Sequence, residues 1–235
     1  MDVDLKVAQL LCSRLCHDLV GPAGAAHNGI ELLDEMGAGG GGEALTLIGG
    51  SVRQLSTRLA FFRFAFGHGG LSGRKPTLEE TRDLAQAFLA GGRTTLDWPL
   101  DAIASGIPEF SAHAAKLLLN MVLVGVDALP RGGSLGVSIA EIGDDAGGKP
   151  GDKPGGKAIG MAVRAAGSGA RLKEDLSAAL AAGTASGASE DALTAHNVHG
   201  YFCQKMAGTL GCNVEVSEGD DEVQLAVLVP GNIGG

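Results

Sequence analysis

The chain has 235 residues with a formal net charge of −9, and 45% of them are hydrophobic but only 4% aromatic. This length allows one large or two small domains, and the many aliphatic side chains favour helices packed on helices over a β-sandwich. The acidic balance argues against nucleic-acid binding, and the lack of a roughly 20-residue apolar run or a signal-peptide layout indicates a cytoplasmic protein without a membrane partner.

Residues 3–36 are expected to form a long amphipathic helix, because apolar side chains recur at spacings of three, four and seven. The glycines of residues 37–42 end it, and residues 43–66 repeat the pattern, so the two helices should form an antiparallel hairpin. Two helices cannot cover each other's apolar faces. Either two chains pair their hairpins in a four-helix bundle, or the C-terminal half of one chain covers its own hairpin. The residues that need this cover are Leu47, Phe61, Phe64 and Phe66.

Residues 67–73 are glycine-rich and predict a hinge between a helical domain of residues 1–70 and a second domain of residues 71–235. His68 in this hinge is expected to be a solvated loop residue. Beyond it, helices and strands mix, which predicts an α/β two-layer sandwich and an α+β fold for the whole chain. The expected helices are 77–90, capped by Thr77, 111–129, capped by Ser111, 172–181 and 190–208; the expected strands are 94–100, 134–142, 158–165, 213–217 and 222–229, with a solvated loop at 143–157.

His17 lies in the middle of the first predicted helix. Its neighbours on the same face, three, four and seven residues away, are mostly small or polar, which predicts a shallow surface that another protein can approach. These neighbours are Leu10, Ser13, Arg14, Val20, Gly21 and Gly24.

Pro22 follows His17 by five residues and lies inside the same predicted helix. Because proline has no backbone N–H, the carbonyl of Asp18 loses its helical partner and the helix should bend there. Proline in a helix interior costs about 3 kcal/mol of helix stability, so the presence of Pro22 at this position calls for an explanation.

The pattern His17-Asp18-x-x-x-Pro22 resembles the phosphoacceptor motif of the dimerisation helices of sensor histidine kinases, and the sequence around it is similar to ChpT-type histidine phosphotransferases. The resemblance implies a homodimer with a four-helix bundle and a C-terminal domain like the kinase ATPase domain. It also implies transfer of a phosphoryl group from the receiver domain of a hybrid sensor kinase to the receiver domains of response regulators, with Mg²⁺ held by the receivers.

The C-terminal half shares some residues with a kinase ATP site and lacks others. Asn120 matches the kinase asparagine that helps to hold Mg²⁺, and residues 130–133 resemble the turn after it. At the adenine pocket, however, Ala165 stands where kinases carry an aspartate, and residues 195–202 have bulky side chains where a phosphate-binding loop needs glycines. An adenine amino group without its acceptor would lose about 1–3 kcal/mol. The sequence therefore predicts neither ATP binding nor a cofactor of its own.

We expect His17 to be the phosphoryl carrier, because a neutral imidazole has a free lone pair that can attack phosphorus. Asp18 is expected to orient the ring or accept its proton; the alternative is an exposed ion pair with Arg14. The alternative role of Arg14 is to neutralise phosphate. The remaining supporting or docking candidates are Ser13, Gly21, Pro22 and Gly24. Two alternatives stay open: an ATP-dependent histidine kinase with an unusual pocket, and a non-catalytic dimeric adaptor for receiver domains.

The other histidines and the cysteines give no metal spacing. His196 and His199 are expected to be exposed or capping residues. The cysteines are expected to be reduced thiols in the core; they are Cys12, Cys16, Cys203 and Cys212.

Overall fold

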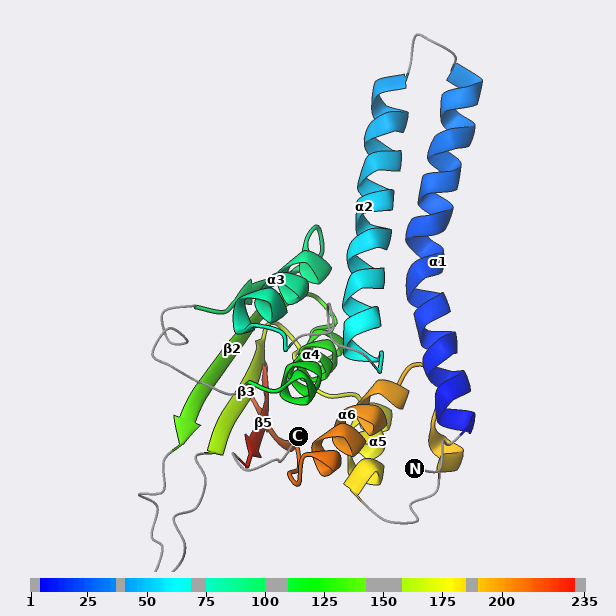
Figure 1. Ribbon diagram of the computed structural model, residues 1–235. Coiled ribbons are helices and arrows are strands. Elements are labelled where there is room, and N and C mark those ends of the chain that lie inside the picture. Colours follow the sequence, from blue (N-terminus) through cyan, green and yellow to red (C-terminus); the bar gives the residue numbers. More distant parts are fainter. Residues whose placement is uncertain are drawn as a thin grey trace, which may run out of the picture.

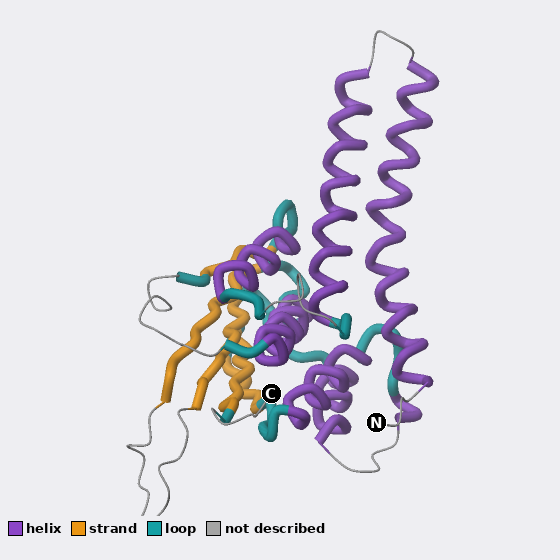
Figure 2. Tube along the Cα trace, in the orientation of Figure 1, coloured by secondary structure: helices purple, strands orange, loops and turns teal. Residues whose placement is uncertain are grey.

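The computed structural model describes residues 5–36, 41–68, 75–99, 110–142, 158–184 and 190–230. Two long helices project as a hairpin from a part that contains a β-sheet and the shorter helices (Figures 1 and 2). The fold is α+β, as the sequence predicts.

The hairpin consists of α1 (Leu5–Met36) and α2 (Gly41–Ala65), which run antiparallel and contact each other along their length. Both helices end within two residues of the predicted positions. The long amphipathic patterns explain this agreement, because they are continuous up to the glycines. The link at residues 37–40 lies outside the described residues.

The lower end of the hairpin is covered by the rest of the same chain. Phe61 and Phe64 are buried in the main core, and Phe61 stacks on Phe88 with 4.1 Å between the ring centroids. Phe66 packs against the same core, whereas Leu47, higher on α2, stays 42% exposed. The C-terminal half thus covers part of the hairpin, and the upper part keeps an uncovered apolar surface.

Phe61→Ala is expected to lower the free energy of unfolding by about 3–5 kcal/mol, because it removes a fully buried ring and leaves a cavity. Urea unfolding followed by circular dichroism measures this loss. Leu228→Ala is the control: Leu228 is 50% exposed, and the change should stay below about 1 kcal/mol. Equal effects of the two substitutions would contradict the assignment of Phe61 to the core.

Helices and strands are mixed after the hairpin, largely where the sequence predicts them. In chain order the elements are α3 (Leu78–Leu89), β1 (Thr94–Asp97), α4 (Ala112–Asp127), β2 (Gly133–Ile142), β3 (Ala158–Ala166), α5 (Glu174–Thr184), the short 3-10 helix η2 (Glu190–Ala192), α6 (Val198–Thr209), β4 (Glu215–Gly219) and β5 (Glu222–Val229).

Both predicted N-caps are confirmed. The Thr77 hydroxyl accepts from the Glu80 backbone N–H at 3.1 Å, and the Glu80 carboxylate accepts from the Thr77 N–H at 2.9 Å, which completes a capping box. The Ser111 hydroxyl accepts from the Ala114 N–H at 3.0 Å. His68, at the start of the hinge, is exposed as expected.

The sheet has the strand order β1-β2-β3-β5-β4, in which β1 pairs with β2 in parallel and the other neighbours are antiparallel. Alternate residues of the central strands are buried, as on Val137, Ile139, Met161 and Val163. They face α4, whose middle is buried on all sides. This arrangement is the predicted two-layer sandwich.

The predicted helix 190–208 is interrupted, and this prediction is wrong in its first half. Only η2 and α6 are helical, and the chain between them is turned by Asn197. Its side-chain amide donates to the carbonyls of Asp175 at 3.3 Å and Ala192 at 3.2 Å, and its oxygen accepts from the Thr194 N–H at 2.8 Å. These bonds to α5 and η2 replace the helical ones.

The prediction of core thiols is also wrong for two cysteines. Cys12 and Cys16 are exposed on α1, whereas Cys203 is buried and Cys212 half-buried. Burial raises the pKa of the Cys203 and Cys212 thiols. All four cysteines are free thiols.

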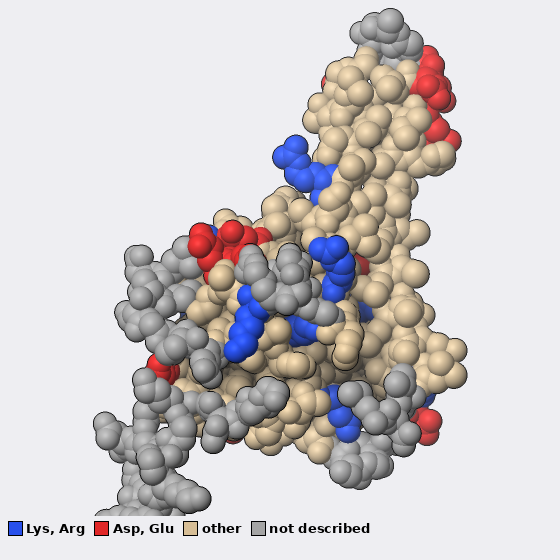
Figure 3. All heavy atoms as spheres, viewed as in Figure 1, with Lys and Arg blue, Asp and Glu red and all other residues tan. Residues whose placement is uncertain are grey.

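Charged side chains are unevenly distributed over the face shown in Figure 3. Acidic groups gather at the far end of α1, where Glu31, Asp34 and Glu35 are exposed. Lys and Arg form separate clusters on this face rather than one continuous stripe. Among the described helices, none is long and apolar enough to cross a membrane.

Candidate functional site

His17 stands exposed on α1, with 68% of its side chain open to solvent. Its Nδ1 lies 3.2 Å from Oδ1 of Asp18, whose side chain is 20% exposed. Neighbouring positions on a helix diverge, so the side-chain rotamers bring these two groups together. An ionised carboxylate can only accept, so Nδ1 is the donor in this pair and the lone pair of the neutral ring is on Nε2.

Pro22 lies inside α1 and is buried, so it is not part of an exposed docking surface. The carbonyl that it leaves without a helical partner, that of Asp18, accepts a hydrogen bond from Nη1 of Arg58 on α2 at 2.7 Å. The proline therefore opens a hydrogen-bonding position that ties α1 to α2 next to His17. The sequence predicted the free carbonyl but gave no signal for Arg58.

Arg14, one turn before Asp18, is only 8% exposed. Its Nε lies 3.7 Å from Oδ2 of Asp18, so the ion pair considered from the sequence is present but not exposed. The rest of the guanidinium is directed to the C-terminal part of the chain, where Nη2 donates to Oδ2 of Asp127 at 2.9 Å and Nη1 to the carbonyl of His196 at 3.0 Å. Arg14 thus belongs to the junction between hairpin and sheet part, and not to the surface that a partner would contact.

The other predicted docking residues are exposed. Ser13 donates to the carbonyl of Gln9 at 2.9 Å and remains on the surface. A Cβ added at Gly21 or Gly24 would meet nothing within 4 Å, so the surface beside His17 is open. Docking of a partner on these residues stays a prediction.

Two histidines of the C-terminal part lie near His17 or the partners of Arg14, and the sequence assigns neither of them to the site. His196 is exposed, as expected, and its ring is edge-on to that of His17 with 5.5 Å between the centroids. His199 is 0% exposed, which contradicts the expectation of an exposed or capping residue. Its Nε2 lies 3.1 Å from the same Oδ2 of Asp127 that Arg14 binds. We call Arg14, Asp127 and His199 the junction cluster.

Burial and charge set the protonation of the junction cluster. Burial lowers the pKa of His199 below its ordinary value of 6.5, and the nearby Arg14 charge acts in the same direction. Burial alone would raise the pKa of Asp127, but its contacts with His199 and Arg14 lower it overall. The cluster therefore holds a neutral His199 between a cationic Arg14 and an anionic Asp127 near neutral pH.

The protein is expected to lose stability as the pH falls below 6.5, because His199 binds a proton more readily in the unfolded chain than in the folded one. The contribution is fully present above that pH and is lost as the pH falls toward the lowered pKa of the folded state. Thermal unfolding of wild type and His199→Gln from about pH 7.5 to about pH 5.5 measures it. The variant should show a flatter decline, and parallel curves would contradict the burial of a neutral His199.

The residues that resemble a kinase ATP site make hydrogen bonds within the chain. Asn120 is buried, and its amide nitrogen donates to the carbonyls of Ala65 at 3.1 Å and Lys116 at 2.8 Å, so that it holds the end of α2. The backbone N–H groups of Gly167 and Gly169 donate to the carbonyl and the carboxylate of Asp221 at 3.0 and 2.6 Å. Within the described residues, no three His, Cys, Asp or Glu side chains gather as a metal site.

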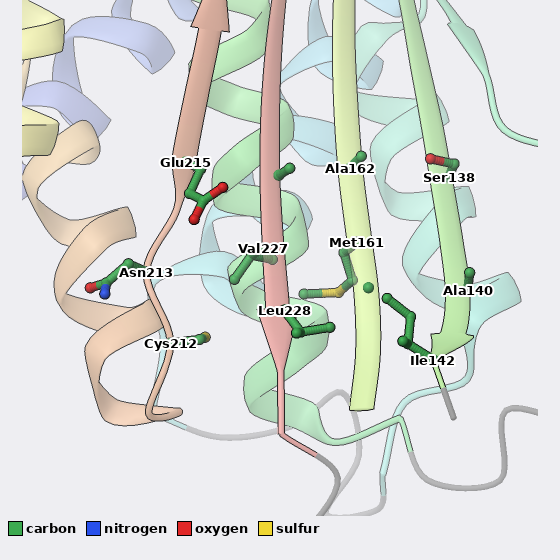
Figure 4. Close-up of a pocket in the computed structure, with 12 residues that line it drawn as sticks. Ser138, Ala140, Ile142, Met161, Ala162, Cys212, Asn213, Glu215, Val227 and Leu228 are labelled. Atoms are coloured by element: carbon green, nitrogen blue, oxygen red, sulfur yellow. The ribbon is translucent and has the colours of Figure 1, made fainter. Parts of the chain in front are cut away.

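A shallow hollow lies on the other face of the sheet, which is turned away from α4. Figure 4 shows small or apolar side chains of β2, β3 and β5 beside Cys212, Asn213 and Glu215. The residues of the strands that line it include Ser138, Ala140, Ala162 and Leu228. Its lining includes the Glu215 carboxylate and the Cys212 thiol but no histidine, and the candidate site stays at His17.

The sequence was compared with known families and proteins. The profile of the family described as "Histidine phosphotransferase C-terminal domain" matches residues 78–222, more than half of the chain. The protein phosphotransferase ChpT of Brucella abortus (strain 2308) is 40% identical over 135 residues, which are 57% of this chain and 61% of that protein. The chain thus matches less than two thirds of the length of this relative.

The fold of this chain is similar to those of solved structures. The structure of a bacterial phosphotransferase superposes with a TM-score of 0.71 at 28% identity, covering 97% of this chain and 98% of the other. The histidine kinase domain of the Erythrobacter litoralis EL346 blue-light activated histidine kinase reaches a TM-score of 0.44 at 13% identity, covering 93% and 96%. With a C-terminal part that matches the family over residues 78–222, this chain belongs to the histidine phosphotransferases defined by that C-terminal domain.

Proposed function

We propose that this protein relays a phosphoryl group through His17 between receiver domains of a two-component phosphorelay. The observation that carries the proposal is an exposed imidazole whose Nδ1 faces the Asp18 carboxylate, in a chain of the histidine phosphotransferase family. The ChpT relative is a protein phosphotransferase by name and supports the same class of reaction. The donor is the receiver domain of a hybrid sensor kinase, and the acceptors are receiver domains of response regulators.

The chemistry follows from the ring orientation. Nε2 of His17 attacks the phosphorus of an aspartyl phosphate on the docked receiver, the P–O bond to that aspartate breaks, and the aspartate leaves as a carboxylate. The imidazole becomes positively charged as the Nε2–P bond forms, and Asp18 stabilises its Nδ1–H. Catalysis is then mainly a matter of positioning and charge, with Mg²⁺ supplied by the receiver.

The proposal includes no ATP binding by this chain. It is supported by Ala165, which offers a methyl group where a kinase offers a carboxylate, and by the Gly167 and Gly169 amides, which already bind Asp221. A phosphate placed on these amides would have to displace that contact.

The proposal also includes a homodimer that pairs two hairpins in a four-helix bundle. The supporting feature is an exposed apolar stripe on α2, where Leu45, Val52 and Leu59 recur every seven residues and are 58%, 48% and 52% exposed. An apolar groove continues the stripe between α1 and α2 and is lined by Leu15, Leu19, Leu59, Phe62 and Phe66, among others. A second copy of the hairpin would cover both.

The test is transfer from a panel of phosphorylated receiver domains to the purified protein without ATP. Label on His17 supports the relay. Label from ATP alone, with no partner present, would make the protein a kinase instead. Receiver binding without any transfer would make it an adaptor.

A further inference from the structure

The junction cluster places two charged groups and a neutral histidine in a largely buried junction, where Arg14 is 8% exposed, His199 0% and the Asp127 side chain 31%. Its members come from three helices: Arg14 from α1, Asp127 from the end of α4 and His199 from α6. Removing charged groups from water costs free energy, and apolar side chains of similar size commonly stabilise such a junction as well or better. The cluster therefore calls for an explanation other than stability.

The contacts of Arg14 lead from the cluster to both neighbours of the His17 ring. On one side, Nε of Arg14 lies 3.7 Å from Oδ2 of Asp18, whose other oxygen faces Nδ1 of His17 at 3.2 Å. On the other side, Nη1 of Arg14 donates to the carbonyl of His196 at 3.0 Å, and the His196 ring is edge-on to His17. Asp127 binds the remaining end of the guanidinium, with His199 against the same carboxylate oxygen. Two hydrogen bonds, to Asp127 and to the His196 carbonyl, fix the guanidinium. Its Nε makes no hydrogen bond, and the 3.7 Å ion pair attracts the Asp18 carboxylate to this fixed charge.

We propose that the junction cluster positions the His17 imidazole for phosphoryl transfer, by holding Asp18 against Nδ1 and His196 beside the ring. Arg14, Asp127 and His199 are positioning residues, since none of them touches the reacting atoms. The inference rests on the proposed function of His17 and assigns the C-terminal domain a part in the transfer step itself.

The cluster acts on the protonation of the ring through Asp18. While Asp18 is held in place, the proton of the neutral imidazole stays on Nδ1 and the lone pair stays on Nε2. Without this hold, Asp18 can turn to solvent and the ring divides between its two tautomers, of which the one with Nε2–H cannot attack from that nitrogen. Losing the hold on Asp18 is therefore expected to slow the chemical step and to leave docking unchanged.

The test is Asp127→Asn, which keeps the size of the side chain and removes the charge that holds Arg14. Two phosphoryl donors are used: a phosphorylated receiver domain that the wild type discharges, and phosphoramidate, a small donor that needs no docking and releases ammonia when its P–N bond breaks. The rate of phosphoryl uptake by His17 in a single turnover should fall on the order of tenfold to a hundredfold with both donors, as expected for a misplaced reacting group. The KM for the receiver should stay at the wild-type value.

The matched control is Asp191→Asn. Asp191 lies 3.9 Å from Lys6 in another ion pair between α1 and the C-terminal part, and it is 99% exposed. The same change of charge across the same junction should leave uptake unchanged. A reduction equal to that of Asp127→Asn would overturn the specific role of the cluster.

A spectroscopic measurement separates positioning from a merely structural role. Imidazole ¹⁵N NMR of His17 should report the Nδ1–H tautomer in the wild type and a mixture of both tautomers in Asp127→Asn. Asp127→Glu, which restores the carboxylate, should return the spectrum and the uptake rate part of the way. If Asp127→Asn melts at a lower temperature but takes up phosphoryl at the wild-type rate with an unchanged spectrum, the cluster is structural only and the proposal is overturned.

If Asp127→Asn does not fold, Arg14→Lys makes the same test, because lysine keeps the charge but cannot hold three partners in a fixed geometry. A reduction in uptake with unchanged KM supports the proposal, and wild-type uptake overturns it. His17→Ala distinguishes a failure of this inference from a failure of the proposed function. Loss of label in His17→Ala with wild-type uptake by Asp127→Asn overturns this inference alone, whereas label retained in His17→Ala overturns the proposed function as well.

Discussion

His17→Ala is expected to abolish phosphoryl uptake from a phosphorylated receiver domain while receiver binding stays within a few-fold of wild type. The ring supplies the attacking atom in the proposed reaction, so its loss removes the phosphoryl acceptor. Because His17 is exposed and makes no contact with the core, the fold should be unaffected. Labelled transfer followed on gels, with binding measured by calorimetry, tests both parts of the expectation.

His27→Ala is the matched control for this experiment. His27 is also an exposed histidine on α1, ten residues further along, and its Nε2 lies 3.3 Å from Oε1 of Glu31 in the next turn. The residue after it is Asn28, so it has no acid at the next position. The variant should accept phosphoryl at the wild-type rate. Equal loss in both variants, or persistent label in His17→Ala, would contradict the assignment of the carrier.

Leu59→Glu is expected to weaken the proposed dimer on the order of a hundredfold or more. Two-fold symmetry would place the new carboxylate in the interface twice, and burying an unpaired charge costs several kcal/mol, where each 1.4 kcal/mol is a factor of about ten in affinity. Leu59 is the residue at which the exposed stripe of α2 joins the apolar groove. Sedimentation equilibrium of the two proteins over a range of concentrations gives the change.

Leu228→Glu introduces the same charge at a leucine of the same exposure, 50% against 52%, but on the open face of the sheet. It should leave the dissociation constant unchanged. A wild type that is monomeric at micromolar concentration, or a Leu59→Glu protein that remains a dimer, would contradict the four-helix bundle. In that case the C-terminal half, which buries Phe61 and Phe64, would be the cover of the hairpin in place of a second copy.

Several features of this fold follow from neighbouring residues, and these were predicted well. The hairpin helices end where their apolar periodicity meets glycine, and both N-caps depend on hydroxyls three residues before the amide they bind. The strands of the central sheet were recognised from alternation along a few residues. The loop predicted at 143–157 lies outside the described residues and remains a prediction.

The predictions that failed concern residues whose partners are far away in the sequence. Asn197 ends the predicted helix 190–208 because its amide binds the carbonyl of Asp175 on α5, 22 residues away. His199 is buried because α6 packs on the end of α4, and nothing in its neighbourhood in the chain indicates Asp127. Cys12 and Cys16 are exposed on α1, so no residue that is distant in the sequence buries them.

The sequence by itself determined the family resemblance, the phosphoacceptor candidate His17 with its neighbour Asp18, and the loss of one helical hydrogen bond at Pro22. The residues of the motif, His17, Asp18 and Pro22, lie within five positions of one another, and the wider resemblance is carried by the residues directly around them. Only the tertiary structure decided that Arg58 fills the position opened by Pro22, and that Arg14 is a buried link to Asp127 rather than an exposed docking residue. The physical reason is that hydrogen bonds between groups 40 and 113 residues apart depend on how the helices pack, and periodicity and spacing carry no information about that.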